Sequence, residues 1–233
     1  MSTFAEVIAD LQGIASPDDI DKVARFFKGD PETKVMGVSI GKIFPIAKRY
    51  TDLSLADVEC LLDDSRYEVR MAGVSILDFK ARKKTLRDDE RAALYALYIR
   101  KHDRINNWDL VDRAAPHVVG EYLLNKDRSE LERLAVSDDP HRRRTAIVAT
   151  HAFLKRGEVD GTFRIAELLA EDADDYVQKA VGSWTREAGK TDRNALIAFL
   201  DRNRARLPRP TLTAASKGLP DDIRARLREE KSR

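Results

Sequence analysis

The segment Leu61-Leu62-Asp63-Asp64 is followed closely by Tyr67-Glu68-Val69-Arg70-Met71-Ala72, and this pattern decides the fold. An apolar helix end leads into an acidic turn, and a second helix then begins with a polar residue two positions before an alanine. The same pattern recurs at Ser137–Ile147 and at Leu168–Val181. Three copies of one helix–turn–helix unit indicate an internal repeat.

The spacing of the copies gives the repeat length. Ala146 and Ala180 are 34 positions apart, and Ala72 precedes Ala146 by 74 positions, which is about twice 37. Helix pairs that recur at this period are typical of HEAT or armadillo repeats. A diverged copy is therefore expected near residues 103–120. We predict an all-α fold, an α-solenoid of HEAT-like helical repeats with a concave basic face.

Apolar residues recur at helical spacing along almost the whole chain, and no segment alternates as a strand would. No stretch resembles a flexible linker, so we expect a single domain over residues 1–233, with a charged tail from about Arg224. Ser16 and Ser54 are expected to cap the helices that follow them, and Pro116 is expected to kink the helix in which it lies. The expected helices cover residues 2–14, 17–27, a segment to Tyr50 that contains Pro45, 55–62, 88–101, 108–125, 129–136, 162–170, 176–188, 193–206 and a last helix from Pro220.

Composition excludes several classes of protein. Hydrophobic residues make up 42% of the 233 residues and charged residues 35%, which suits a helix-rich globular chain. The net charge of +2 comes from 42 basic and 40 acidic side chains, so a basic surface requires segregation of the two signs. Cys60 is the only cysteine, and no apolar run reaches membrane-spanning length. We expect a cytoplasmic monomer that does not associate with a membrane.

Motifs of the familiar enzyme classes are missing from the sequence. The four histidines show no HExxH spacing, and a single cysteine argues against a zinc site. Gly-rich phosphate loops, a GxSxG elbow and the kinase motifs are also absent. We therefore expect neither a metal nor a cofactor, which leaves a binding protein or an unusual hydrolase.

The diverged repeat contains Asn106-Asn107-Trp108-Asp109-Leu110-Val111-Asp112. Trp108 and Asp112 are four residues apart, so on a helix they share one face. An aromatic surface beside a carboxylate, with Arg144 from a later helix, suits a cationic aromatic group. Alternatively, Trp108 packs in the core as most tryptophans do, and Asp112 pairs with Arg113 or Arg144.

Basic residues recur on the second helices of the repeats. On the helix from Tyr176 one stripe contains Lys179, Ser183, Arg186 and Lys190, and the opposite stripe, which includes Trp184, is apolar. Such stripes on neighbouring helices would form a groove for a phosphate backbone. The alternative is that they are ordinary solvated faces.

Several blocks, in this order, resemble the AlkD-like DNA alkylation repair family, whose members are HEAT-like-repeat DNA glycosylases. The resemblance spans most of the chain, and the Trp-Asp-x-Val-Asp element is its most specific part. The blocks are Ala24–Lys28, Lys34–Ser39, Asn107–Asp112, Arg143–Ile147, Gln178–Gly182, Arg186–Lys190 and the Leu207-Pro208 break before a short basic helix.

The resemblance implies hydrolysis of the N-glycosidic bond of cationic N3- or N7-alkylated purines in duplex DNA, without deep base flipping. It implies that Trp108 lies against the deoxyribose of the lesion and that Asp112 stabilises the developing sugar cation and positions water. Arg144 would hold a phosphate near the lesion. The residues expected to bind DNA are Arg143, Arg144, Lys179, Ser183, Arg186, Lys83, Lys84 and Phe26.

The sequence departs from the family pattern at two positions. The second active-site tryptophan of the family falls at Ser183, and Trp184 is rotated about 100° around the helix from it. Phe26 occupies the position of an aromatic residue that carries a hydroxyl in the family. Two other functions therefore stay open: a non-catalytic protein that binds damaged or branched DNA, and a HEAT-type protein-interaction scaffold.

Overall fold

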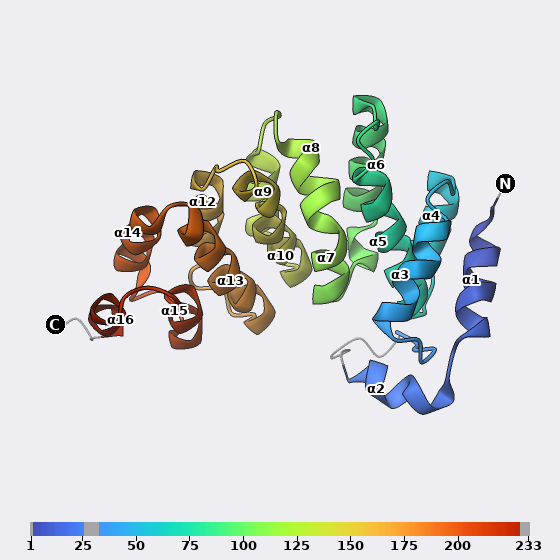
Figure 1. The fold of residues 1–233 in the computed structure, drawn as a ribbon, viewed down its shortest axis with the longest axis horizontal. Coiled ribbons are helices and arrows are strands. Elements are labelled where there is room, and N and C mark those ends of the chain that lie inside the picture. The colour runs from blue at the N-terminus through green and yellow to red at the C-terminus, as the bar shows by residue number, and fades with distance from the viewer. Residues whose placement is uncertain (1, 26–32, 229–233) are drawn as a thin grey trace. The chain divides into compact units, whose positions relative to one another are not determined.

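The computed structural model of the chain describes residues 2–25 and 33–228 (Figure 1). Over these residues the chain is helical, and its β pairing is limited to a bridge between Lys34 and Arg66. The predicted all-α class is confirmed. The chain divides into two compact units, residues 1–122 and 123–233. None of the described helices is both long enough and apolar enough to cross a bilayer.

The first unit contains helix pairs of the predicted kind. α4 packs on α5, and α6 packs on the π-helical turn that continues α7. The helices of this unit are α1 (Phe4–Gly13), a 3-10 turn (Pro17–Asp19), α2 (Ile20–Ala24), α3 (Ile40–Arg49), α4 (Leu55–Leu62), α5 (Tyr67–Ala81), α6 (Asp88–Arg100), a 3-10 turn (His102–Arg104), α7 (Trp108–Ala115) and a π-helical turn (Pro116–Gly120), after which α8 (Glu121–Leu123) leads out of the unit.

Helix α5 is the centre of the first unit. It packs against α3, α4 and α7, and every residue from Tyr67 to Asp78 is buried. A helix that is surrounded on all sides is expected to be hydrophobic all round. α5 nevertheless contains Glu68, Arg70, Ser75 and Asp78, so each of these polar side chains needs a partner inside the unit.

The second unit repeats the same arrangement. α10 packs on α9 and α13 packs on α12, and the second helices α10, α13 and α15 lie against one another in that order. Its helices are α9 (Ser129–Ala135), α10 (Pro140–Ala149), α11 (His151–Leu154), α12 (Asp160–Leu168), α13 (Asp175–Thr191), α14 (Arg193–Asn203), α15 (Arg209–Ala215) and α16 (Asp221–Arg228).

Local sequence signals set several helix ends. The Ser54 hydroxyl accepts a hydrogen bond from the Asp57 N–H, as a cap of α4 should. At Pro116 the predicted kink takes the form of a π-helical turn, because proline has no N–H to continue the α-helical ladder. The helix expected to run through Phe27 is a 3-10 turn followed by α2, which ends at Ala24.

The loop before α3 is held by a buried carboxylate on α5. Glu68 accepts hydrogen bonds from the N–H groups of Met36, Gly37 and Val38, at 3.0, 2.9 and 3.2 Å. Gly37 has φ of +83°, and a Cβ added there would lie 2.1 Å from the carbonyl oxygen of Ser16. Glycine is therefore required at this position both by the backbone conformation and by the close approach of another segment.

We expect Gly37→Ala to lower the free energy of unfolding by more than about 1 kcal/mol, because the native conformation does not admit a side chain. Gly41→Ala is the matched control, since a Cβ there meets nothing within 4 Å and the residue lies in α3. Urea unfolding of both variants measures the difference. Equal stabilities would show that the loop rearranges without cost.

Candidate functional site

Helix α7 places the two residues singled out as catalytic. Trp108 is its first residue and Asp112 follows one turn later, so the predicted spacing on one helix is present. Both side chains are half-buried, which differs from a tryptophan enclosed in the core. A half-buried indole and carboxylate can still contact a ligand while being oriented by the fold.

The start of α7 is held by a buried hydrogen-bond network. The Tyr67 hydroxyl donates to Asp109 Oδ2, and Asn107 Nδ2 donates to Asp109 Oδ1 at 2.8 Å. Burial raises the pKa of Asp109 above its ordinary value, and hydrogen bonds from Tyr67, the Leu110 N–H and Asn107 oppose that rise. Burial and the same carboxylate raise the pKa of Tyr67. This network orients the turn from which Trp108 and Asp112 project.

A second buried group on α5 holds the segment before that turn. Arg70 donates from Nη2 to Thr33 Oγ1 at 2.7 Å and to Asn106 Oδ1 at 3.2 Å, and from Nη1 to the Asp64 carbonyl at 2.9 Å. One guanidinium therefore joins three segments that are distant in sequence. Because the fork of an arginine is rigid, these contacts restrict the position of Asn106 closely.

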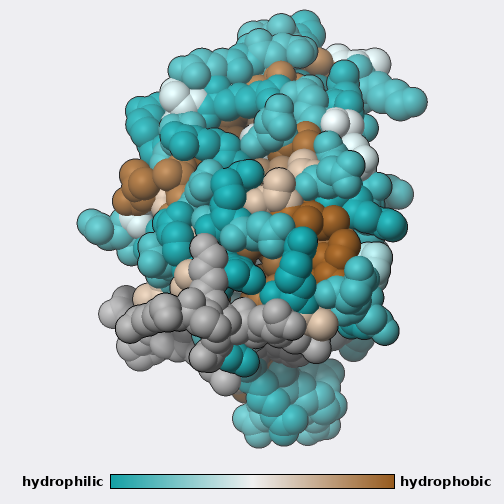
Figure 2. Space-filling model, turned by 90° about the vertical axis from the view of Figure 1, so that its left-hand side faces the viewer, coloured by the Kyte–Doolittle hydropathy of each residue, from teal (hydrophilic) through white to brown (hydrophobic). Residues whose placement is uncertain are grey.

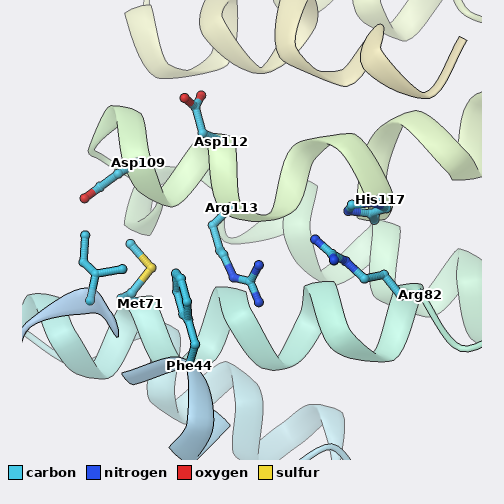
Figure 3. Close-up of a pocket in the computed structure, with 8 residues that line it drawn as sticks. Phe44, Met71, Arg82, Asp109, Asp112, Arg113 and His117 are labelled. Atoms are coloured by element: carbon cyan, nitrogen blue, oxygen red, sulfur yellow. The ribbon is translucent and has the colours of Figure 1, made fainter. Parts of the chain in front are cut away.

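A hollow of about 260 Å³ lies beside α7 within the first unit. Its lining includes Asp109, Asp112, Arg113, Arg82 and His117. Figure 3 shows Asp112 and Arg113 projecting from different sides of α7, with Arg82 and His117 near each other. The hollow is smaller than the roughly 300–1,000 Å³ of ordinary small-molecule sites.

The cationic side of the hollow is built on buried Asp78. This carboxylate pairs with Arg113 Nη1 at 3.0 Å and Arg82 Nε at 3.0 Å, and it contacts His117 Nδ1 at 2.7 Å. Arg113 also lies over the rings of Phe44 and Phe79, at 4.3 and 4.7 Å from its guanidinium carbon to the centroids. Burial lowers the pKa of Arg113, and Asp78 opposes that change. Arg113 is therefore held in place by its ion pair with Asp78.

In the second unit, α10 contains two of the three arginines predicted to bind DNA, Arg143 and Arg144. Arg143 binds Asp172 through Nε at 2.6 Å and Nη2 at 3.1 Å, and it donates from Nη1 to the carbonyls of Ser137 and Asp138. Arg144 is buried, and its Nη1 donates to the Tyr176 carbonyl on the next helix pair. Arg143 is thus engaged in joining the acidic turns of two repeats. A phosphate contact by either residue stays a prediction.

Helix α13 separates its two faces as predicted. Lys179 and Ser183 are exposed and Arg186 is half-buried, whereas Val177, Ala180 and Val181 are buried. Trp184 is half-buried, with its ring centroid 4.9 Å from that of His151. The indole is therefore at the edge of the apolar face and Ser183 is on the polar one, as their separation around the helix requires.

Three further residues were expected to bind DNA, namely Lys83, Lys84 and Phe26. Lys83 and Lys84 are exposed in the turn after α5, where Lys83 Nζ lies 3.1 Å from Asp52 Oδ1. Phe26 lies outside the described residues. Among the residues that the structure describes, no group of three or more His, Cys, Asp or Glu side chains could hold a metal ion.

Sequence reasoning missed the groups that support α7, namely Tyr67, Asp78 and His117. A signal was present along α5 and its C-cap, where Ser75, Asp78 and Arg82 follow at spacings of three and four in a segment that is mostly apolar. Polar residues that recur along one line of a buried helix indicate a buried network, because unpaired polar groups are costly there.

Comparison with known proteins identifies the family and agrees with the fold. The sequence matches the family model of DNA alkylation repair enzymes over residues 7–219. Among solved structures, a protein described as a predicted DNA alkylation repair enzyme from Enterococcus faecalis superposes with a TM-score of 0.68 at 16% identity, covering 89% of this chain and 97% of its own. A search of curated protein sequences gave no match. The chain belongs to the DNA alkylation repair enzyme family.

We expect Tyr67→Phe to lower the free energy of unfolding by about 1–3 kcal/mol at neutral pH, because Asp109 loses a donor in a buried site. The hydroxyl stabilises the ionised carboxylate. The loss should therefore shrink as the pH falls through the raised pKa of Asp109, where the folded protein takes up the proton. Urea unfolding at a series of pH values measures this.

Tyr50→Phe is the control for that series. Tyr50 donates to Asp10, whose side chain is 36% exposed and can recruit water instead. Its substitution should cost less than Tyr67→Phe. If the two variants lose the same stability at every pH, the Tyr67–Asp109 hydrogen bond does not support α7 in the way described.

Proposed function

We propose that the protein is a DNA repair glycosylase that hydrolyses the N-glycosidic bond of cationic N3- or N7-alkylated purines in duplex DNA, without deep base flipping. Membership of the DNA alkylation repair family supports DNA as the substrate. The observation that carries the proposal is the Asp112 carboxylate on α7, one turn from Trp108 and beside a small hollow.

The chemistry requires little more than that carboxylate. An alkylated purine is cationic, so it leaves as a neutral base once the glycosidic bond breaks. Positive charge then develops on the sugar, as in other glycoside hydrolyses. Asp112 would stabilise that charge and orient the attacking water, and a fixed carboxylate in a partly desolvated site is well suited to both tasks. Trp108 would provide a flat surface for the deoxyribose.

The small hollow at α7 supports recognition without deep flipping. Enzymes that extrude a base need a pocket that encloses it. The hollow lined by Asp112 is below the ordinary range for such ligands. A lesion would therefore be contacted mainly through its sugar and backbone, with Lys179, Ser183 and Arg186 contributing backbone contacts from the polar face of α13.

We expect Asp112→Asn to reduce release of 7-methylguanine from methylated duplex DNA by roughly 100-fold or more, as loss of an electrostatic stabiliser typically does. Binding to the same duplex should change little. Asp103→Asn is the control, since Asp103 is an exposed carboxylate shortly before α7. Base release is measured by chromatography under single-turnover conditions. No release by the wild-type protein, together with intact duplex binding, would instead establish a non-catalytic DNA-binding relative.

Ser183→Trp restores the second active-site tryptophan that the family resemblance places at this position. Ser183 is exposed on α13, so the larger side chain can be accommodated without repacking the core. We expect base release to increase at least severalfold if an indole at this position contacts the lesion. Ser183→Ala, which also removes the hydroxyl but adds no aromatic ring, should not increase the rate. A rate that is unaltered by tryptophan would show that residue 183 does not reach the lesion.

A further inference from the structure

The turn between α5 and α6 borders another hollow in the first unit, with a volume of about 480 Å³. This volume falls within the roughly 300–1,000 Å³ of ordinary small-molecule sites. The proposed excision chemistry does not use it. Its polar lining includes Thr51 and Asp52 before α4, Lys80 on α5, Lys83 and Thr85 in the turn, and Glu90 on α6.

This hollow is separate from the one that Asp112 lines. Arg82 lines the hollow of Asp112 and follows Lys80 by two positions, which is about 200° around a helix. The Lys83 N–H donates to the Lys80 carbonyl at 3.1 Å, so the helical turn continues past the end of α5. Lys80 and Lys83, three positions apart, therefore lie on one side of that turn.

The ion pairs of the hollow leave one amine over. Five charged residues line it: Asp52, Lys80, Lys83, Arg87 and Glu90. Lys83 Nζ pairs with Asp52 Oδ1 at 3.1 Å, and Arg87 Nη1 pairs with Glu90 Oε1 at 3.4 Å. The Lys80 side chain makes no hydrogen bond or ion pair with any residue that the structure describes.

Lys80 is also less hydrated than most lysines, because its side chain is half-buried. Charged side chains ordinarily remain in water, and Figure 2 shows another face of the molecule that is mainly hydrophilic. Burial lowers the pKa of Lys80, Lys83 lowers it further, and Asp52 and Glu90 oppose the change. A larger share of this amine is therefore unprotonated than of an exposed lysine, and the unprotonated form is the nucleophile.

We propose that the Lys80 amine is a modification site that reacts with carbon dioxide to form a carbamate. Three features of the first unit define this site: a half-buried amine without an ion-pair partner, a neighbouring ammonium group on Lys83, and free volume in which a carboxylate group fits. The reaction does not involve Asp112 or DNA, so it stands or falls independently of base excision.

The reaction needs no other reactant. The Lys80 ammonium first loses a proton to water, and the lone pair of its nitrogen then attacks the carbon of carbon dioxide. A C–N bond forms, one C–O π bond opens to give a carboxylate, and the nitrogen releases a second proton to water. The side chain changes from a charge of +1 to a charge of −1.

The hollow stabilises the product relative to the free amine. Before the reaction, Lys80 and Lys83 are two cations on one side of a turn, and they repel each other. Afterwards the carbamate and Lys83 attract each other. Lys83 gives up only its contact with Asp52, whose side chain is 95% exposed and readily hydrated. The hydroxyl groups of Thr51 and Thr85 line the same hollow and are suitable donors to the carbamate oxygens.

The test traps the carbamate on the full-length protein. The protein is equilibrated with ¹³C-labelled bicarbonate as the source of carbon dioxide, treated with a trialkyloxonium reagent that esterifies carbamates, digested, and analysed by mass spectrometry. We expect saturable labelling of Lys80. Lys84 is the matched control, because it is exposed in the same turn and does not line the hollow, and it should be labelled at least severalfold less. The N-terminal amine is read from its own peptide.

Lys80→Arg keeps the positive charge and removes the nucleophile. The ¹³C resonance of the carbamate should be present in the wild-type protein and lost in this variant, and thermal unfolding confirms that the variant is folded. Absence of label at Lys80 at saturating carbon dioxide would overturn the proposal. Equal labelling of Lys80 and Lys84 would overturn it as well, because the hollow would then confer nothing.

Two substitutions at the edge of the hollow should act in opposite directions. Lys83→Gln removes both the cation that lowers the pKa of Lys80 and the partner of the carbamate, so occupancy at a given concentration of carbon dioxide should fall by roughly two- to fivefold, the range for one partly exposed ion pair. Asp52→Asn frees Lys83 and should raise occupancy. Unchanged occupancy in both variants would refute the role of the hollow, and Asp52 is exposed enough for its substitution to leave folding intact.

Discussion

The first unit depends on the requirement that every polar group buried on α5 finds a partner. Glu68 accepts from three backbone N–H groups of the loop before α3, and Arg70 donates to Thr33, Asn106 and the turn at Asp64. Asp78 pairs with Arg82 at the end of α5 and with Arg113 on α7, and it contacts His117 in the π-helical turn. Because an unpaired buried charge is far more costly than an exposed one, these contacts oppose any other placement of the surrounding segments.

The candidate catalytic helix is a consequence of that constraint. The segment that begins α7 is held by Tyr67 through Asp109 and by Arg70 through Asn106, and the helix itself is held by Arg113. None of these side chains needs to touch a substrate. They position a short helix whose first residue is Trp108 and whose next turn presents Asp112. A carboxylate intended to stabilise a transient cation benefits from such support, because its orientation then costs nothing at the moment of reaction.

In the second unit, polar side chains at the start of the second helices join one helix pair to the next. Gln178 donates to carbonyls of the turn after α12 and accepts from Thr211 on α15, much as Arg70 joins its own turn to Asn106. Arg143 and Arg144 likewise join α10 to the repeat that follows. In a helical repeat the polar position at the start of each second helix therefore serves packing between repeats.

The sequence by itself determined the helical class, the pairing of helices around acidic turns, the cap at Ser54, the break at Pro116 and the spacing of Trp108 and Asp112, because these depend on periodicity and local backbone chemistry. It also separated Ser183 from the apolar face of α13. Only the tertiary structure decided which charged residues are available to a ligand. Arg143 was expected to bind DNA, and Arg113 was considered as a partner of Asp112. In the structure Arg143 pairs with Asp172 in the turn after α12, and Arg113 pairs with Asp78 on α5. Such pairings join positions about 30 or more residues apart, and no local pattern specifies them.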